Sequence, residues 1–465
     1  MGETRRESDA MGEVEVPADA LYGAQTARAV SNFPVSGWTM PGEFIAALGR
    51  IKQAAAEVHK AAGRMDAATA DAIAAAAGRV AARKLDAQFP VDVFQTGSAT
   101  STNMNANEVI ARLATQRLRD AGDAEASVHP NDDVNRAQSS NDVIPTAMHL
   151  AAATGLRDRL IPALESLRDA LSRKAAELDD VVKLARTHLM DAVPIRLDQE
   201  LAGHAAGVEA AVRALQGALE GLCELPIGGT AVGTGLNAPP GFGAAMCAAL
   251  ADRTGLALRE ADNHVHAQSV RDAVLLASGA LRSCATTLGK IASDLRLLAS
   301  GPRCGLGELR LPPVQPGSSI MPGKVNPVLC ESVVQVACQV TGCDAAIAAG
   351  CTGGVGGLLE LNVAMPMMAW NLLTEIRLLT NVAGAFERGC VAGIEADRDR
   401  CAELLERSLA LVTALVPRIG HDRACAIARR AHAEGKTIRQ VCRDEGVLPA
   451  DELDALLDAR KQTGE

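Results

Sequence analysis

The feature that most restricts how this chain can fold is a run of apolar side chains whose spacing alternates between four and three residues. Over residues 270–298 these positions are Val270, Val274, Ala277, Leu281, Cys284, Leu288, Ile291, Leu295 and Leu298. Side chains at this spacing lie along one face of an α-helix. The pattern therefore predicts a single helix about four heptads long, with an apolar seam typical of coiled coils.

Three further segments repeat the pattern and predict helices of similar length. Their apolar positions are Leu201, Ala205, Val208, Val212, Leu215, Leu219 and Leu222 in the first, Val333, Val336, Val340, Cys343 and Ile347 in the second, and Leu160, Leu164, Leu167 and Leu171 in the third. Helices this long form a bundle roughly 40 Å or more in length, at about 1.5 Å per residue. So many apolar stripes exceed what one chain covers alone, and we expect other copies of the chain to complete the bundle.

Composition supports helices over sheets. Apolar residues make up 48% of the chain but aromatic residues only 2%, so the core must be built from Ala, Leu, Val and Ile. A β-sandwich would call for more aromatic and β-branched residues. We therefore expect an all-α fold in three parts: a mixed helical domain over 1–137, a central domain of long bundled helices over 138–393, and a small helical domain over 394–465.

Charge and cysteine content exclude several classes of protein. A net charge of −10 argues against a nucleic-acid binder, although a few cations in a cleft can still attract an anionic substrate. No uninterrupted apolar stretch reaches the length of about 18 residues that a membrane-spanning helix needs. The charged N-terminus has no signal-peptide core. The twelve cysteines lack a C-x-x-C pair, which predicts reduced thiols and no zinc site. Together these observations predict a cytoplasmic protein with no membrane partner.

One irregular loop stands between two of the predicted helices. It reads Gly317-Ser318-Ser319-Ile320-Met321-Pro322-Gly323-Lys324-Val325-Asn326-Pro327. Its prolines each remove a backbone donor and fix φ, so the segment cannot be a regular helix or strand. A loop held by rigid helices is a common place for reactive side chains. The alternative is a plain glycine-proline connector.

Three other segments place polar side chains where a loop meets a predicted helix. Residues 96–105 are rich in small hydroxyl and amide groups and predict a helix N-terminus, whose free N–H groups suit a carboxylate. The alternative there is an ordinary Ser/Thr cap. Residues 129–142 read His-Pro-Asn-Asp-Asp and then, from 138, Gln-Ser-Ser-Asn-Asp. Residues 186–194 hold His188 in a polar turn before a bundle helix, although a lone histidine is more often structural.

These segments supply many neutral hydrogen-bond donors, one lysine, one histidine and a loop serine. The chain shows no nucleophile elbow, phosphate loop or dinucleotide-binding glycine motif. The donor set suits a small dicarboxylate, with Lys324 and Asn326 holding one carboxylate and Thr100, Ser140 and Asn141 holding the other. Removing a proton next to a carboxylate creates a doubly charged enediolate, so such donors must be preorganised for charge that develops in the transition state.

All four segments resemble the fumarase/aspartase superfamily, in the form found in class II, iron-independent fumarases and aspartate ammonia-lyases. The resemblance runs from about Met11 to about Leu457. It implies a fumarase/aspartase-like fold, a homotetramer whose central bundle comes from all four subunits, and active sites shared between subunits. It also implies anti elimination from a dicarboxylate with neither a metal nor an organic cofactor.

The resemblance also implies roles for individual residues. Ser318 is the base that takes the C3 proton, His188 and Asn141 hold a water that helps the leaving group depart, and Glu331 pairs with His188. A serine base requires the backbone N–H groups of its loop to surround Oγ. The substrate-binding residues that it implies are Ser98, Thr100, Ser139, Ser140, Asn141, Thr187, Ser319, Lys324 and Asn326.

A possible second dicarboxylate site follows from the same resemblance at His129, Asn131 and Asp132. Fumarases carry basic residues just before this motif, whereas this chain has Ala126 and Ser127, which argues against a working second site. Other departures are Ala99, Ala185 and Asp198, each where the family has glycine.

Three functions remain in competition. Ser140 and the Thr187-His188 pair favour fumarate hydratase, since aspartases usually have threonine at position 140. An aspartate ammonia-lyase performs the same elimination with ammonia as the leaving group, and a paralogue could act on a related dicarboxylate. A helical scaffold protein retired from catalysis would be expected to have lost Ser318, Lys324, His188 or Asn326, and all four are present.

Overall fold

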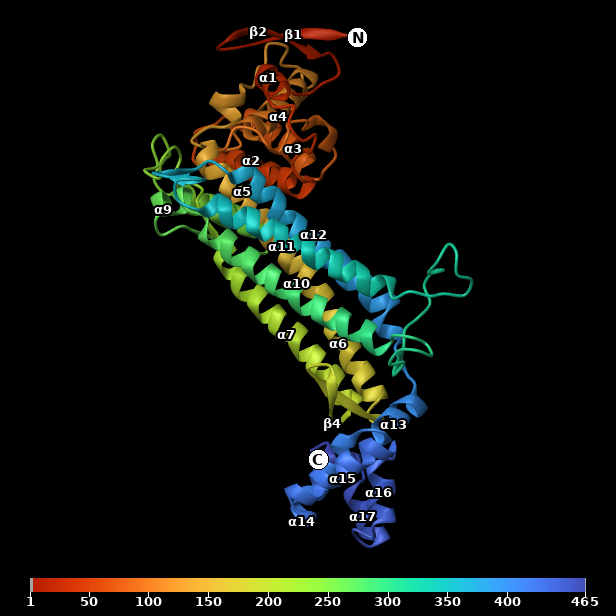
Figure 1. Cartoon of the computed structure of the whole chain (residues 1–465). Helices are drawn as coiled ribbons and strands as arrows, with labels where there is room; N and C mark the ends of the chain where they lie inside the picture. Colours follow the sequence, from red (N-terminus) through yellow and green to blue (C-terminus); the bar gives the residue numbers. More distant parts are fainter. Residues whose placement is uncertain (1–2, 465) are drawn as a thin grey trace. The chain divides into compact units, whose positions relative to one another are not determined.

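A computed structural model describes residues 3–464 (Figure 1). The described chain divides into two compact units. The first unit holds the described residues up to 162 together with 213–283 and 338–380. The second holds 163–212, 284–337 and the described residues from 381 onward. The three-domain division at residues 137 and 393 stays a prediction.

The four helices that the apolar spacing predicts are all present. They are α6 (Ile161–Glu177), α7 (Leu197–Leu222), α10 (Asp272–Leu298) and α11 (Val328–Cys351). On α10 every predicted stripe position from Val274 to Leu298 is buried, at 6% exposure or less. Val270 was wrongly included in this helix. It follows the short helix α9 (His264–Ser269), has extended backbone and is 37% exposed.

A fifth long helix, α12 (Met365–Gly389), was not among those predicted. Its first half buries Met365, Met368, Leu372 and Ile376 completely, and its neighbouring residues are buried as well. Its apolar positions nevertheless repeat at steps of three and four, and polar residues such as Arg377, Asn381 and Arg388 line the opposite face. The segment therefore carries the same kind of pattern as α10 and could have been predicted from the sequence.

The first unit is built from helices and short hairpins. Its helices α2 and α3 approach closely because Gly49 has no side chain: a Cβ there would lie 2.5 Å from the backbone N of Ala81. Besides parts of the long helices, its elements are β1 (Thr4–Asp9), β2 (Gly12–Pro17), α1 (Ala24–Asn32), α2 (Gly42–Ala61), α3 (Ala67–Ala81), α4 (Thr100–Asp120), α5 (Ser140–Gly155), β5 (Glu224–Leu225), α8 (Phe242–Thr254), β6 (Arg259–Glu260), α9, β8 (Gly357–Leu358) and β9 (Leu361–Asn362).

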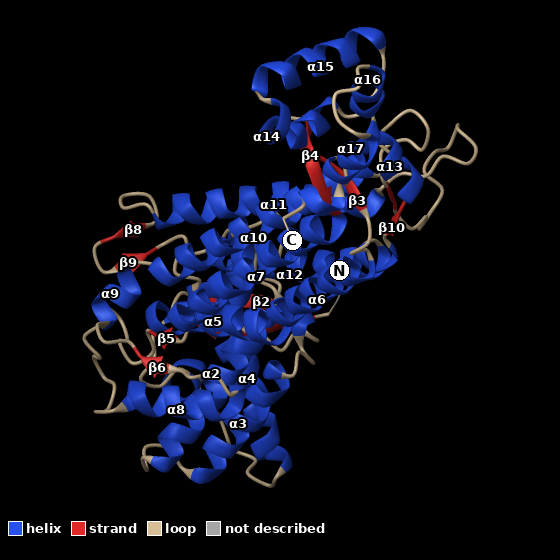
Figure 2. Ribbon diagram, turned by 90° about the horizontal axis from the view of Figure 1, so that it is seen from below, coloured by secondary structure: helices blue, strands red, loops and turns tan. Residues whose placement is uncertain are grey.

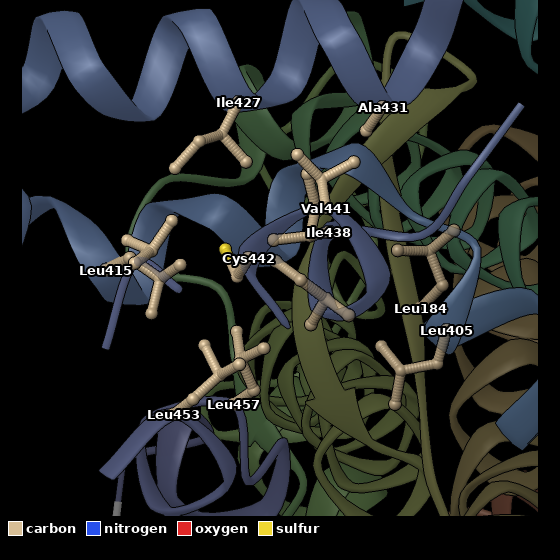
Figure 3. Close-up of a cluster of buried hydrophobic side chains, with 12 residues drawn as sticks. Leu184, Leu405, Leu415, Ile427, Ala431, Ile438, Val441, Cys442, Leu453 and Leu457 are labelled. Carbon is tan, nitrogen blue, oxygen red and sulfur yellow. The ribbon is translucent and has the colours of Figure 1, made fainter. Parts of the chain in front are cut away.

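The second unit adds a hairpin and the predicted set of short C-terminal helices. Its elements are β3 (Val182–Thr187), β4 (Met190–Arg196), β7 (Leu309–Arg310), β10 (Glu395–Ala396), α13 (Arg398–Glu406), α14 (Val416–Ile419), α15 (His421–Glu434), α16 (Ile438–Asp444) and α17 (Ala450–Leu456). The C-terminal helices share a small apolar core with Leu184 of β3, shown in Figure 3. Its other members are Leu405, Leu411, Leu415, Ile427, Ala431, Ile438, Val441, Cys442, Val447, Leu453 and Leu457.

The mostly helical architecture confirms the predicted fold class. All strands in the described part of the chain belong to two-stranded sheets, and Figure 2 shows how little of the fold they form. Helix α11 is long and apolar enough to cross a membrane by length and composition. Its stripe of Cys330, Val333, Val340 and Ile347 is nevertheless buried in the protein at 1% exposure or less, as in a core helix.

A polar cluster interrupts the apolar packing of α10, α11 and α12 in the first unit. The Ser278 hydroxyl on α10 donates to Asp344 Oδ1 on α11 at 2.7 Å, and lies 3.2 Å from Glu375 Oε1 on α12. Arg282 donates to the other oxygen of Asp344 at 2.7 Å. Glu375 is completely buried, which raises the pKa of its carboxyl to about 9, and the nearby Asp344 charge adds to the shift.

This raised pKa predicts a pH-dependent stability. The folded chain keeps Glu375 protonated at pH values where the unfolded chain ionises it, so stability falls as pH rises between about 4.5 and about 9. The slope from this group is up to about 1.4 kcal/mol per pH unit. We expect Glu375→Gln to flatten the fall in melting temperature between pH 5 and 8. The control Glu387→Gln, on the same helix, should follow the parent protein; equal slopes for all three would contradict the prediction.

Candidate active site

The predicted site residues fall into two sets, one in each compact unit. Ser98, Thr100 and residues 139–141 belong to the first unit. Thr187, His188 and residues 318–331 belong to the second. Each set is built by its own local structure.

The loop over 317–327 is closed at its base by its own hydrogen bonds. The Gly317 N–H donates to the Lys324 carbonyl at 2.7 Å, and the Asn326 side-chain amide donates to the Gly317 carbonyl at 2.6 Å. Gly317 is needed for this closure, since a Cβ there would lie 2.6 Å from the Asn326 N. These bonds bring the backbone on both sides of the loop close together, and the substrate-binding roles of Ser318, Lys324 and Asn326 stay predictions. The amide of Asn326, however, is occupied in shaping the loop.

Backbone donors surround the Ser318 hydroxyl oxygen. The N–H groups of Ile320 and Met321 donate to Ser318 Oγ at 3.2 and 3.0 Å. This is the arrangement that a serine base would require, because two N–H dipoles aimed at one oxygen stabilise negative charge on it. Ser319 is exposed and receives no such bond from residues of the described chain.

His188 is carried on the turn of the β3–β4 hairpin, which the sequence patterns did not predict. Thr187 pairs with Met190, and the two turn residues, His188 and Leu189, both have left-handed backbone, with φ of 57° and 61°. Two such residues form the tight turn that suits a twisted hairpin. Because neither is glycine, the turn costs on the order of 1 kcal/mol or more per residue and holds the imidazole out from the sheet.

A buried ion network anchors this hairpin. Arg186 donates to both carboxylate oxygens of Glu308, at 2.8 and 3.1 Å, and Glu308 is completely buried. Lys183 lies 3.4 Å from Glu308 and 3.1 Å from Glu200. A bidentate pair of this kind fixes both distance and angle. The direction of β3, and with it the position of His188, therefore depends on Glu308.

Glu331 lies in the first turn of α11 and is half-buried. The predicted pairing of Glu331 with His188 does not occur within one chain: among residues 3–464 neither side chain makes an ion pair with any other. The imidazole of His188 is exposed.

In the first unit, α4 begins at Thr100 as predicted. Its N-cap is Ala99, which is fully buried and has left-handed backbone with φ of 53°. The family resemblance predicts glycine at this position, and glycine adopts this conformation without cost, whereas alanine does not. The Ser98 and Thr100 hydroxyls lie 2.9 Å apart, while the Gln95 side chain accepts from the Thr102 N–H.

The Ser-Ser-Asn-Asp segment forms the N-terminus of α5. Ser139 and Asp142 make a capping box, and Asp142 also accepts from the N–H groups of Gly228 and Thr230 at 3.1 and 3.0 Å. Asp142 is completely buried, and burial raises the pKa of its carboxyl to about 6. The Asn141 amide donates to the carbonyl of Ala231 at 2.7 Å. The glycine-rich segment after β5 is thereby fixed beside Ser140 and Asn141.

Sequence reasoning missed two residues behind this segment. Asn103 on α4 donates from Nδ2 to Ser140 Oγ at 3.2 Å and to Asn135 Oδ1 at 3.1 Å. Lys52 on α2, completely buried, donates to the same Asn135 oxygen at 2.9 Å. The signal available was a lysine in the middle of a helix whose neighbours on the same face, Leu48, Gly49, Ala55 and Ala56, are apolar or small.

The residues of the possible second site mainly hold their own turn together. His129 Nδ1 accepts from the N–H groups of Asn131 and Asp132 at 3.3 and 3.1 Å. Its ring nitrogen also lies 3.3 Å from the Asp132 carboxylate. An imidazole used in this way has one nitrogen left for a ligand.

Comparison with known proteins decides the family. Residues 12–342 match the family described as Lyase, and residues 411–464 match the family described as Fumarase C C-terminus. The chain is 51% identical to the class II fumarate hydratase of Chromobacterium violaceum, and the match covers 97% of each protein. With that of Mycobacterium tuberculosis, identity is 52% over 98% of this chain and 95% of the relative. The chain belongs to the class II fumarate hydratases.

Solved structures agree with this assignment. The fold matches a class II fumarase from Schistosoma mansoni with a TM-score of 0.96 and 37% identity, over 99% of each chain. A fumarate lyase from Brucella melitensis matches with a TM-score of 0.94 and 43% identity, over 100% of each chain. The prediction of a fumarase, a hydro-lyase, over an aspartase is confirmed. Helix α11 is one of the core helices of this fold.

The anchoring of the hairpin gives a testable expectation. We expect Glu308→Gln to destabilise the protein by about 3 kcal/mol or more, since it leaves two buried cations without a full counter-charge. We also expect kcat/KM to fall, because the hairpin that carries His188 loses its anchor. Melting temperature and fumarate turnover measure the two effects.

The matched control is Asp180→Asn, which removes the exposed ion pair between Asp180 and Arg398 in the same unit. It should cost less than about 1 kcal/mol and leave turnover unchanged. Equal effects of the two substitutions would contradict the anchoring role of Glu308.

Proposed function

We propose that the chain interconverts fumarate and (S)-malate by anti addition and elimination of water, in a site assembled from several copies of the chain in the cytoplasm. The observation that carries this proposal is the pair of N–H bonds to Ser318 Oγ. They answer the main chemical objection to a serine base, which is that an alkoxide is strongly disfavoured in water.

In the elimination direction Ser318 Oγ takes the proton from C3 of malate. The electrons pass into the neighbouring carboxylate, which becomes an enediolate with two negative charges. The hydroxyl group then leaves C2, takes a proton from the water held by His188 and Asn141, and departs as water. The proton that Ser318 took from C3 neutralises the hydroxide left from the held water as the site resets, so the elimination balances. In hydration the same steps run in reverse, and Ser318 returns its proton to C3.

The charged carboxylate needs donors that are already in position. Lys324 supplies the positive charge on the loop, and Asn326 keeps Lys324 beside Ser318 by closing the loop. Thr100, Ser140 and Asn141 supply neutral donors for the other carboxylate. We assign supporting contacts with the substrate to the polar groups of Ser98, Ser139, Thr187 and Ser319.

A homotetramer with shared sites would join the two sets. Among residues 3–464 of one chain His188 and Glu331 make no ion pair, and we propose that each finds its partner on another copy. Large apolar side chains also stand exposed where a partner would cover them: Leu276 on α10 is 69% exposed, and Ile320 on the loop is 83% exposed. Exposed apolar surface of this kind is typical of protein interfaces.

A working second site at His129, Asn131 and Asp132 has little support. One imidazole nitrogen caps the turn, and the Asp132 carboxylate beside it repels a dicarboxylate. We propose no metal or organic cofactor, because the elimination needs only proton transfer and charge stabilisation.

The assigned base predicts a large, specific loss of activity. We expect Ser318→Ala to lower kcat by about 10²- to 10⁴-fold, with a much smaller change in KM, because the hydroxyl acts in the transition state. The ultraviolet absorbance of fumarate measures the rate in both directions. Ser319→Ala is the matched control and should lose far less. Full activity in Ser318→Ala, or turnover of aspartate in place of malate, would overturn the assignment.

Shared sites predict that two inactive variants rescue each other. Ser318→Ala and His188→Asn should each be inactive alone. If the two residues of one site come from different copies, random mixing of unfolded chains and refolding should restore about a quarter of the sites. Gel filtration should show a tetramer. A stable, active monomer, or no rescue in a properly formed mixed tetramer, would contradict the proposal.

A further inference from the structure

Lys52 is a completely buried cation that takes no part in the proposed chemistry. It lies in the middle of α2, and its side chain makes no ion pair with residues 3–464 of the chain. Its ammonium donates to Asn135 Oδ1 at 2.9 Å and to Gln138 Oε1 at 3.0 Å. Burial lowers its pKa to about 7, and the Asp142 charge opposes the shift. A cation in such a place costs stability unless its donors are used.

Lysine can only donate hydrogen bonds, and this fixes how its partners are oriented. The atom of Asn135 that faces Lys52 must be the oxygen. The same orientation is required by the second bond of the Asn135 side chain, in which Nδ2 donates to the Gln138 carbonyl at 3.1 Å. The amide of Gln138 is fixed in the same sense, since its Nε2 donates to the carbonyls of Val134 and Arg136 at 3.2 Å each. If the side-chain amide of Asn135 or Gln138 were flipped, its NH2 group would face the Lys52 ammonium and its oxygen would face a backbone carbonyl. Both orientations are therefore fixed.

The same rule extends to Asn103 and then to Ser140. Since Asn135 presents its oxygen, the atom of Asn103 that meets it must be Nδ2, at 3.1 Å. That same Nδ2 lies 3.2 Å from Ser140 Oγ. The hydroxyl oxygen of Ser140 must therefore accept this bond. Its own proton is then left to point elsewhere, and residues 3–464 of one chain offer it no acceptor.

We infer that Lys52 is a positioning residue that, through Asn135 and Asn103, holds the Ser140 hydroxyl as a donor toward the substrate carboxylate. A serine hydroxyl can donate or accept, and a donor is what a carboxylate needs. If Asn103 were free to flip, its oxygen would attract the Ser140 proton and remove one donor from the site. The inference rests on the proposed function, because it requires Ser140 to contact the substrate.

Lys52→Met removes the first donor of the hydrogen-bond network that leads from Lys52 to Ser140. Methionine fills a similar volume but donates no hydrogen bond. We expect kcat/KM for fumarate to fall by about 10- to 100-fold, the scale of a misdirected substrate contact. Lys60→Met is the control: it lies on the same helix, is exposed, and pairs with Asp71 at the surface. It should match the parent enzyme. Gel filtration and circular dichroism must show an intact assembly for each variant.

A double-mutant cycle separates positioning from a merely structural role. If Lys52 acts through Ser140, then Lys52→Met in the Ser140→Ala background should cause little further loss. If Lys52 only supports the fold, the two losses should multiply. Multiplied losses would overturn the inference. If Ser140→Ala alone leaves kcat/KM unchanged, the proposed substrate contact itself fails, which is a different result.

A comparison of Asn103→Asp with Asn135→Asp tests the inference even if Lys52→Met does not fold. Both variants change an amide to a carboxylate, at two residues that are hydrogen-bonded to each other. Asn103→Asp replaces the donor that faces Ser140 with an oxygen, so the hydroxyl should turn toward the new carboxylate and activity should drop. Asn135→Asp keeps the oxygen that accepts from both Lys52 and Asn103, and loses only the bond from Nδ2 to the Gln138 carbonyl. It should retain at least about tenfold more kcat/KM than Asn103→Asp. The opposite order would overturn the inference.

Discussion

The constraint on which the structure depends is the burial of apolar stripes along helices of more than twenty residues. On α10 the buried apolar positions repeat from Val274 to Leu298, and the cluster at Ser278 is a buried polar exception among them. The proposed site residues lie instead where helices begin or where chain connects them. Ser140 and Asn141 lie at the start of α5, Thr100 at the start of α4, and Ser318 in the loop before α11. The ends of the helices also supply the N–H groups that suit an anion.

The long helices could largely be predicted from local sequence patterns. The β3–β4 hairpin and the partners of Lys52 could not, because no local pattern marks them. The stripe of α10 has a period that only a helix explains, so its existence and its buried face could be predicted. Helix α12 carries a similar stripe from Met365 to Phe386, so its existence could also have been predicted although it was missed. The β3–β4 hairpin turns at His188 and Leu189, without the glycine or asparagine that usually marks a tight turn. Nothing near Lys52 in sequence shows what it contacts, because Asn135 and Gln138 lie 83 and 86 residues away.

The chain keeps buried polar groups in two different ways. Glu375 stays neutral within a helical seam, where a single serine hydroxyl lies within hydrogen-bonding distance of it. Asp142 is also buried, but it accepts three backbone N–H bonds that join the start of α5 to Gly228 and Thr230. A carboxylate satisfied in this way organises backbone over a long sequence separation, whereas a neutral carboxyl in a seam mainly reduces stability at high pH.

The hydrogen bonds that close the base of the loop over 317–327 lower the entropy that this loop can lose when a substrate binds. Bonds between Gly317, Lys324 and Asn326 tie the two ends of the loop together before any ligand arrives. Ordering a free chain costs roughly 1–2 kcal/mol for each residue. Because the base of this loop is already closed, less of the binding free energy of a substrate is spent on ordering it.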